Sequence, residues 1–244
     1  MGKRYAAIWF PYLLPDWWAR QHPETGNIPF VLTAPAKGKT VVKAASPLAR
    51  EKGIRPGMVL ADCKTIFPEL HAYDWPPEKE CRLLKALGEW CIRFSPVVSV
   101  DAPGGLLIDM TGCAHLWGGE VLYRQEMIKK LGMLGYQAQV AIAGTPGVAR
   151  AIAMFGENQM IISSGLEKQA LLPLPPAALT IDNTLQERLY KLGMQTIGSF
   201  INMPGSALRR RLGNDFLQKL QQGLGLIPGL ISPIELATPY FQHL

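Results

Sequence analysis

The chain has 244 residues, 48% of them hydrophobic, and carries a formal net charge of +6. This suits one large domain or two small ones with real cores, and no segment reads as low-complexity. No apolar run approaches the ~20 residues of a membrane span, and the N-terminus lacks the longer apolar region of a secretory signal. We therefore predict a cytoplasmic protein.

The first part of the chain alternates short strands and helices, judged from apolar periodicity and turn residues. The expected elements are a strand at 5–10, a short helix at 16–21, a hairpin of strands 30–33 and 40–45 with a longer loop, and helices at 47–52, 58–67 and 78–93. A second group follows: a strand hairpin at 97–111, a helix of about 12 residues after Glu120, a strand at 137–143 and a helix at 145–154. This order predicts an α+β fold, with a ferredoxin-like sheet backed by two helices and a basic region inserted after the first strand.

The composition changes near residue 165, and a Pro-rich stretch at 172–176 marks a boundary. Beyond it the pattern is helical, with helices expected at 184–192, 196–201, 206–212 and 215–222. The last twenty residues show no clear element.

Positive charge is concentrated in residues 34–64, which contain seven Lys or Arg residues and only two acidic residues. Such a block suits a polyanion such as nucleic acid, and a solvated basic face is an equal alternative. The four cysteines (Cys63, Cys81, Cys91 and Cys113) match no zinc spacing. His115 near Cys113 is a weak metal hint, and buried free thiols are favoured.

Three blocks carry a family resemblance: residues 46–58, 93–101 and 107–112. Together with the helical part after residue 184, they resemble a Y-family (translesion) DNA polymerase in order and approximate spacing over roughly residues 4–225. The resemblance implies a palm formed by 4–10 and 70–165, fingers at 11–69 and a helix-hairpin-helix thumb at 166–230. Residues 231–244 would then form a linker to a little-finger domain that is not represented here.

The resemblance also places the catalytic carboxylates, and most are missing. Asp101 fits the hairpin aspartate of the family, but its glutamate partner falls on Ala102. The acidic pair of the first strand falls on the stretch containing Ala7 and Trp9. Two-metal nucleotidyl transfer needs clustered acids to hold the ions. We therefore expect no metal, no cofactor and no catalysis, with Asp101 as a relic or a structural cap.

The triphosphate contacts that the family implies are also reduced. Arg50 remains from a Tyr-x-x-Arg motif, and Lys52 lies beside it as a remnant phosphate contact. The Asn-Lys pair before the last palm helix is replaced by Pro146-Gly147, with Arg150 one turn further along.

Residues 189–198 resemble a helix-hairpin-helix, in which backbone N–H groups at a helix N-terminus bind a DNA phosphate without reading sequence. The predicted DNA contacts are Lys191, Gly193, Thr196, Gly198, Arg209, Arg210 and Arg211. The alternative is an ordinary helical hairpin in which Gly193 caps the first helix.

The pattern is similar to catalytically defective family members found in bacterial induced-mutagenesis cassettes. That resemblance implies a DNA-binding scaffold that recruits an error-prone replicative-type polymerase to damaged DNA, with a sliding clamp and a RecA-like protein as further partners. Two alternatives remain. One is an active polymerase with displaced ligands among Asp101, Asp109, Asp74 and Glu89. The other is a protein-interaction module that does not bind DNA.

Overall fold

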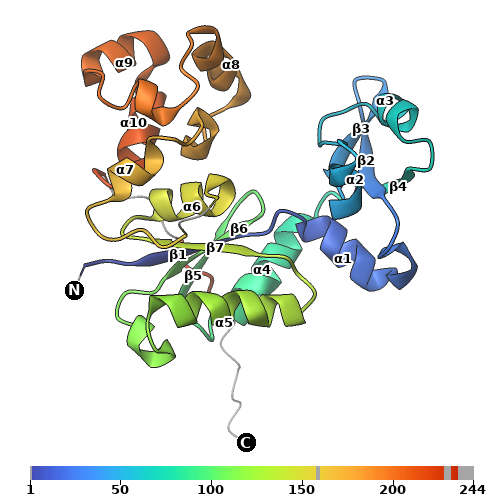
Figure 1. Cartoon of the computed structure of the whole chain (residues 1–244), viewed down its shortest axis with the longest axis horizontal. Helices are drawn as coiled ribbons and strands as arrows, with labels where there is room; N and C mark the ends of the chain where they lie inside the picture. Colours follow the sequence, from blue (N-terminus) through green and yellow to red (C-terminus); the bar gives the residue numbers. More distant parts are fainter. Residues whose placement is uncertain (1, 158–159, 228–231, 236–244) are drawn as a thin grey trace, which may run out of the picture. The chain divides into compact units, whose positions relative to one another are not determined.

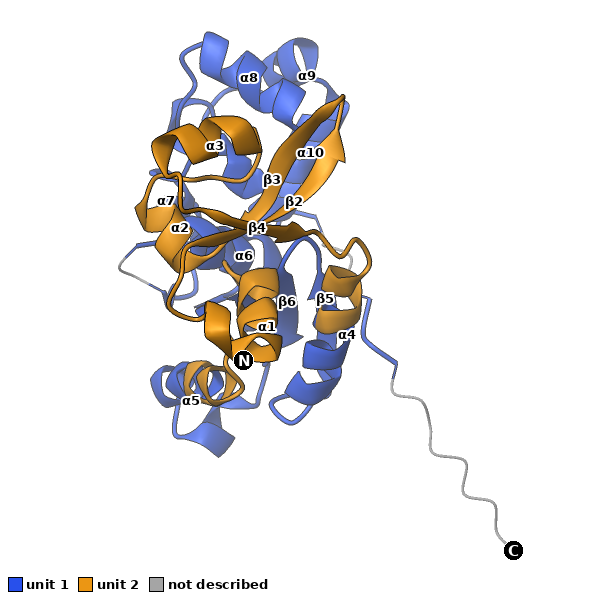
Figure 2. Cartoon of the chain, turned by 90° about the vertical axis from the view of Figure 1, so that its right-hand side faces the viewer, with its two compact units in different colours: residues 1–9, 84–127, 139–244 blue, residues 10–83, 128–138 orange. Residues whose placement is uncertain are grey.

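A computed structural model describes residues 2–157, 160–227 and 232–235. The chain packs as two compact units, coloured separately in Figure 2. The first unit comprises residues 1–9, 84–127 and 139–244, and the second comprises 10–83 and 128–138. Within the described ranges, no helix is long and apolar enough to cross a membrane.

The first unit is built on a four-stranded antiparallel sheet with the order β5-β6-β1-β7. Its strands are β1 (Tyr5–Trp9), β5 (Val97–Asp101), β6 (Gly105–Asp109) and β7 (Gln139–Ala143). With a helix between β1 and β5 and another between β6 and β7, this is the order of a ferredoxin-like sheet. The mixed α/β character predicted from the sequence is confirmed.

Helices cover both faces of this sheet (Figure 1). One face carries Ile8 and Leu106 and packs against α4 (Lys79–Cys91) and α5 (Glu120–Met133). The other face packs against α6 (Pro146–Phe155). This helix begins sharply because the Thr145 hydroxyl accepts a hydrogen bond from the Val148 N–H at 3.3 Å and proline occupies the first helical position.

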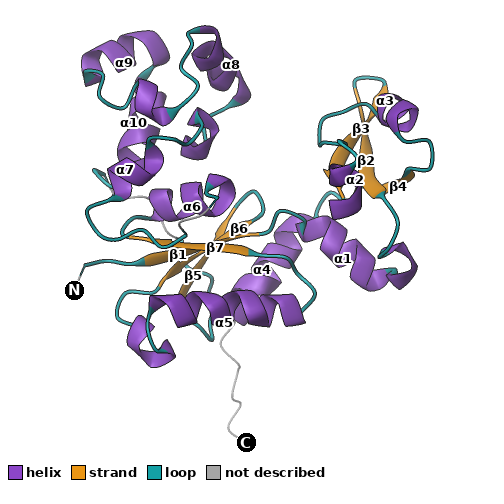
Figure 3. Cartoon of the chain, in the orientation of Figure 1, coloured by secondary structure: helices purple, strands orange, loops and turns teal. Residues whose placement is uncertain are grey.

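The described residues after α6 in the first unit are mainly helical (Figure 3). They share one apolar core with α6. Its elements are α7 (Glu167–Leu171), a 3₁₀ turn η3 (Pro176–Leu179), α8 (Asn183–Lys191), a 3₁₀ turn η4 (Ile197–Ser199), α9 (Gly205–Leu212) and α10 (Asn214–Gly223). The helix predicted at 196–201 is therefore wrong: only one 3₁₀ turn forms there. A further 3₁₀ turn, η2 (Ala114–Trp117), precedes α5. Of the predicted linker at 231–244, only 232–235 lie within the described residues.

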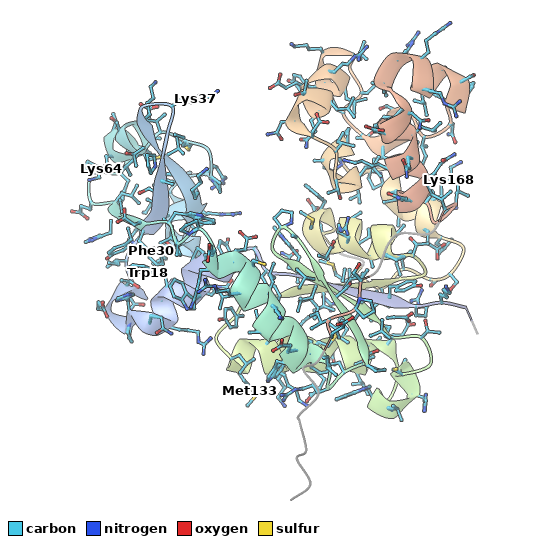
Figure 4. All side chains as sticks on the ribbon, turned by 180° about the vertical axis from the view of Figure 1, so that it is seen from behind. Trp18, Phe30, Lys37, Lys64, Met133 and Lys168 are labelled. Carbon is cyan, nitrogen blue, oxygen red and sulfur yellow. The ribbon has the colours of Figure 1, made fainter. Side chains whose placement is uncertain are left out.

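The second unit contains a three-stranded sheet with the order β3-β2-β4. Its elements are α1 (Leu13–Gln21), a 3₁₀ turn η1 (Pro23–Thr25), β2 (Phe30–Ala36), β3 (Lys39–Ala45), α2 (Pro47–Glu51), α3 (Leu60–Ile66) and β4 (His71–Asp74). The predicted longer hairpin loop is wrong, because β2 and β3 are joined by Lys37 and Gly38 alone, both with positive φ, as a tight right-twisted hairpin requires. Figure 4 shows the Lys37 side chain at this tip. Strand β4, which pairs parallel to β2, was not predicted.

Candidate functional site

Two residues of the predicted centre, Trp9 and Asp101, lie in one row across the sheet. In the strand register, Trp9 of β1 faces Gly105 of β6, and Gly105 faces Asp101 of β5. Residues directly opposite one another point to the same face, so Trp9 and Asp101 both project toward α6. A cavity of about 290 Å³ covers this row and is lined by Ala7, Trp9, Asp101 and Ala102 among others. The structure therefore brings all four predicted residues of the centre together.

Arg150 of α6 enters the same cavity and binds Asp101. Its Nε donates to Asp101 Oδ2 and its Nη2 donates to Oδ1, so one guanidinium edge engages both carboxylate oxygens. Its third nitrogen, Nη1, donates to Thr180 Oγ1 at 3.2 Å. The Asp101 side chain is 12% exposed and that of Arg150 is 31% exposed. A bidentate pair of this kind is among the stronger charge-assisted hydrogen-bond geometries.

The cavity is a poor match to the two metal ions that a Y-family fold implies. Each ion needs several oxygen ligands, and two-metal sites hold their ions about 4 Å apart. Ala7, Trp9 and Ala102 supply no side-chain oxygen, and both oxygens of Asp101 already accept from Arg150. No group of three or more His, Cys, Asp or Glu side chains placed for a metal occurs in the described part of the chain. The residues present do not fit a pair of catalytic metals.

The other acids considered as displaced ligands have separate positions. Asp109 lies at the far end of β6 from Gly105, about 13 Å along the strand, where its Oδ1 accepts from the Thr111 N–H at 3.0 Å. Glu89 is on α4, which packs against the Leu106 face of the sheet, opposite to the face of Asp101. Asp74 ends β4 and belongs to the second unit. Within the first unit, neither Asp109 nor Glu89 can join Asp101 at one metal.

Asp16, the first carboxylate after β1, has a structural setting in the second unit. It lies in the first turn of α1, is 8% exposed, and its Oδ2 accepts from the Gln137 N–H at 2.8 Å. Desolvation by burial raises the pKa of Asp16 to about 6, and the Gln137 hydrogen bond offsets part of that rise. Asp16 therefore ties α1 to the segment before β7.

The predicted phosphate-binding turn in the helical part has few free donors. Gly193 has φ 72° and caps α8, with its N–H donating to Tyr190 O at 2.9 Å. The N–H groups of Ile197 and Gly198 donate to Leu174 O at 2.8 Å and Leu172 O at 2.9 Å. The backbone carbonyls of Leu172 and Leu174 thus occupy the N–H groups of Ile197 and Gly198, which are then not free to bind a phosphate.

The charged side chains predicted to bind DNA are exposed. Arg209, Arg210 and Arg211 lie in the last turn of α9, and Lys191 ends α8. None of the three arginines forms an ion pair within the described residues. Three consecutive helical positions cover about 200° of the helix surface, so these side chains fan outward rather than line one face.

Arg50 and Lys52 lie on and just after α2 in the second unit. The Arg50 guanidinium sits 5.1 Å from the centre of the Tyr12 ring, and its Nη2 donates to Pro11 O at 3.4 Å. Its Nε is buried and has no partner among the described residues. The Lys52 ammonium lies 5.8 Å from the Phe67 ring. Their role as phosphate contacts stays a prediction.

Sequence reasoning missed the Arg150–Thr180 contact and the Lys219 side chain, whose Nζ donates to Thr180 O at 2.7 Å. In the sequence, Arg150 is recognisable only as a cation one turn beyond the position where the family resemblance implies a lysine. Its partner Asp101 lies 49 residues earlier in the chain, and no local pattern signals a pair at that separation. Thr180 belongs to no motif from which a role in the site could be predicted.

The sequence of this chain is similar to those of several known proteins. Residues 9–154 match the model of the impB/mucB/samB family. The chain is 35% identical over 192 residues to "Protein ImuB" of Caulobacter vibrioides, covering 79% of this chain and 42% of that protein. It is 28% identical over 192 residues to "DNA polymerase IV 2" of Mesorhizobium japonicum, covering 76% and 46%. The chain thus spans less than half the length of these curated relatives.

Solved structures share the fold. The crystal structure of DinB from Sulfolobus solfataricus superposes with a TM-score of 0.72 at 17% identity, covering 94% of this chain and 69% of that one. An insertion ternary complex of Dbh DNA polymerase gives a TM-score of 0.73 at 17% identity, covering 93% and 69%. At this identity the likeness shows a Y-family palm-and-fingers type of fold.

Proposed function

Because this chain belongs to the impB/mucB/samB family, we propose that it is a non-catalytic, polymerase-like scaffold that binds DNA in damage tolerance and induced mutagenesis. The observation that carries the proposal is the Asp101–Arg150 pair, in which a guanidinium occupies both oxygens of the one remaining hairpin carboxylate. The likeness to ImuB supports it. The similarity to relatives named DNA polymerase IV supports the alternative hypothesis, an active translesion polymerase.

The loss of catalysis follows from electrostatics. Metal ions that neutralise developing phosphate charge provide most of the acceleration in phosphoryl-transfer chemistry. A centre with one carboxylate, already neutralised by arginine, cannot gather two ions. In primer extension with Mg²⁺ or Mn²⁺ we expect no template-directed synthesis. Synthesis that Asp101→Ala abolishes would contradict this and support the polymerase with displaced ligands.

DNA binding is proposed to rest on side-chain charge in the helical part, taken as a thumb at 166–230. Arg209, Arg210, Arg211 and Lys191 are exposed, whereas the amides of Ile197 and Gly198 are already bonded. Contacts of this kind go to phosphate and carry no sequence information. The solved relatives include polymerase–DNA complexes such as the Dbh ternary complex, which is consistent with a DNA-binding fold.

The test is a salt series of fluorescence anisotropy with a labelled primer-template. Replacing Arg209, Arg210 and Arg211 with alanine is expected to weaken binding about tenfold or more near physiological salt, and to reduce the slope of log K against log salt by up to about 3. The matched control removes three other exposed cations, Arg82, Lys85 and Lys129, and should leave most of the binding. Equal losses in both triple variants would indicate only a general charge effect and contradict the proposed contact residues.

Absence of binding even at low salt would favour the alternative of a protein-interaction module. The proposed partners are a sliding clamp, the RecA-like protein ImuA and an error-prone replicative-type polymerase. A pull-down of the full-length protein from damage-treated cells, probed for these three, tests recruitment separately from DNA binding. Recovery of none of them would contradict the scaffold role.

A further inference from the structure

The Asp101–Arg150 pair is one part of a longer chain of contacts. Arg150 reaches from α6 to Asp101 at the end of β5 and also to Thr180 Oγ1, which follows η3. The Thr180 carbonyl in turn accepts from Lys219 of α10 at 2.7 Å. Two cations and one carboxylate thus connect four elements of the first unit: a strand, the helix on its face, a 3₁₀ turn and a thumb helix.

The backbone conformation of Thr180 is unusual and suits these two contacts. Its φ of 56° lies in the left-handed region, and Lys37 is the other non-glycine described residue with positive φ. A β-branched residue rarely adopts this conformation and does so only where its surroundings determine it. Here the conformation lets the Thr180 hydroxyl accept from Arg150 and its carbonyl accept from Lys219.

We propose that Arg150 is a resident cation that replaces divalent metal at this centre and fastens the β5–β6 hairpin to the helical part through Thr180. The guanidinium occupies the two oxygens that a metal would need, and its charge repels an arriving cation. Charge balance at the centre is then internal, one cation to one carboxylate, and independent of metal supply.

A double-mutant cycle tests the pair. Asp101→Asn and Arg150→Met are each expected to lower the melting temperature by several degrees, because each leaves a poorly solvated charge without its partner. The double variant should lose clearly less than the sum of the two. The control cycle uses Glu78→Gln and Arg82→Met, an exposed pair with both side chains more than 70% exposed, which should be additive. Additivity at Asp101 and Arg150 would overturn the proposal.

The effect of Mn²⁺ on the melting temperature tests whether Arg150 takes the place of a metal ion. Because a lone carboxylate holds a divalent ion only weakly, Mn²⁺ at about 50 mM should slightly raise the melting temperature of Arg150→Met, in which Asp101 is free to bind it, and leave the wild type and the double variant unchanged. If Arg150→Met does not fold, Arg150→Lys keeps the charge but loses the fork, and should give an intermediate Mn²⁺ response. A Mn²⁺ effect as large in the wild type would overturn the proposal.

Thr180 is tested by a conservative pair of variants. Thr180→Val loses the hydroxyl and should speed hydrogen exchange in α10, whereas Thr180→Ser keeps the acceptor and should not. Equal exchange in the two would overturn the fastening role. The inference rests on the proposed function only in treating the centre as metal-free. DNA synthesis in the primer-extension assay would contradict the proposed function. Lack of coupling between Asp101 and Arg150 in the double-mutant cycle would contradict this inference alone.

Discussion

Two poorly exposed carboxylates, one in each unit, have different hydrogen-bond donors. Asp101 of the first unit has a guanidinium across both of its oxygens. Asp16 of the second unit has one backbone N–H, from Gln137, and desolvation raises its pKa to about 6. The acid that resembles a catalytic ligand is therefore neutralised by a full charge, and the acid that is poorly compensated holds two segments together.

These two settings show two ways to keep a buried acid without metal. A paired carboxylate is costly to remove while its partner is present, because the partner is left as a charge in a poor solvent. A desolvated carboxylate instead opposes folding whenever it is ionised. The same Asp→Asn substitution should then have opposite signs at the two positions.

The largest expected effect is at Asp16. Its pKa rises from 3.8 when unfolded to about 6 when folded, so the folded state binds the extra proton between these values. The stability that this proton provides is fully present below pH 3.8 and is lost as the pH rises through about 6. Asp16→Asn should therefore gain about 2 kcal/mol in unfolding free energy at pH 8, after allowing for a weaker bond from Gln137.

Denaturant unfolding from pH 4 to pH 8 measures this effect. The wild type should lose stability across the window, and Asp16→Asn should lose less. If the unfolding free energies of the two proteins changed in parallel with pH, the desolvated setting of Asp16 would be contradicted. Asp16 and Asp101 would then no longer differ in this respect.

A smaller effect of opposite sign is expected at Asp101. Asp101→Asn should lose about 1–2 kcal/mol at neutral pH, discounted from a fully buried pair because the Arg150 side chain is 31% exposed. Chemical denaturation at one pH suffices, with Glu78→Gln as a control on an exposed pair. A gain in stability would mean that Asp101 is strained by its surroundings rather than satisfied by Arg150.

Local patterns predicted most of the elements but not the contacts between them. The strand at 5–10 follows from a continuous apolar run and the hairpin at 97–111 from its β-forming residues. The helices after Thr145 and before Gly193 follow from capping residues and glycine. Strand β4 has only four residues, with exposed His71 and Asp74 at its ends, so it gives no alternation signal. The grouping of Ala7, Trp9, Asp101 and Ala102 came from a family resemblance, while Arg150 joins Asp101 only through the packing of α6 on the sheet.

The turn after α8 shows the same limit. Thr196 looks like a helix cap, but the carbonyls of Leu172 and Leu174 take the N–H groups that a helix at 196–201 would present. Those carbonyls lie more than twenty residues earlier in the chain, outside any local window. The local sequence therefore could not show which groups accept hydrogen bonds from Ile197 and Gly198.

The smallest expected effect concerns this turn and separates its two possible roles. A Cβ on Gly198 would lie 3.0 Å from Leu172 O, so Gly198→Ala should lose about 1 kcal/mol of stability by disturbing that bond. Gly205→Ala is the control, because its Cβ would meet the Leu217 methyl groups at an ordinary 3.7 Å. If the turn is purely structural, DNA affinity measured by anisotropy stays unchanged in both variants. If Gly198→Ala weakens DNA binding with no change in stability, the backbone of the turn contacts phosphate, and the arginines of α9 do not act alone.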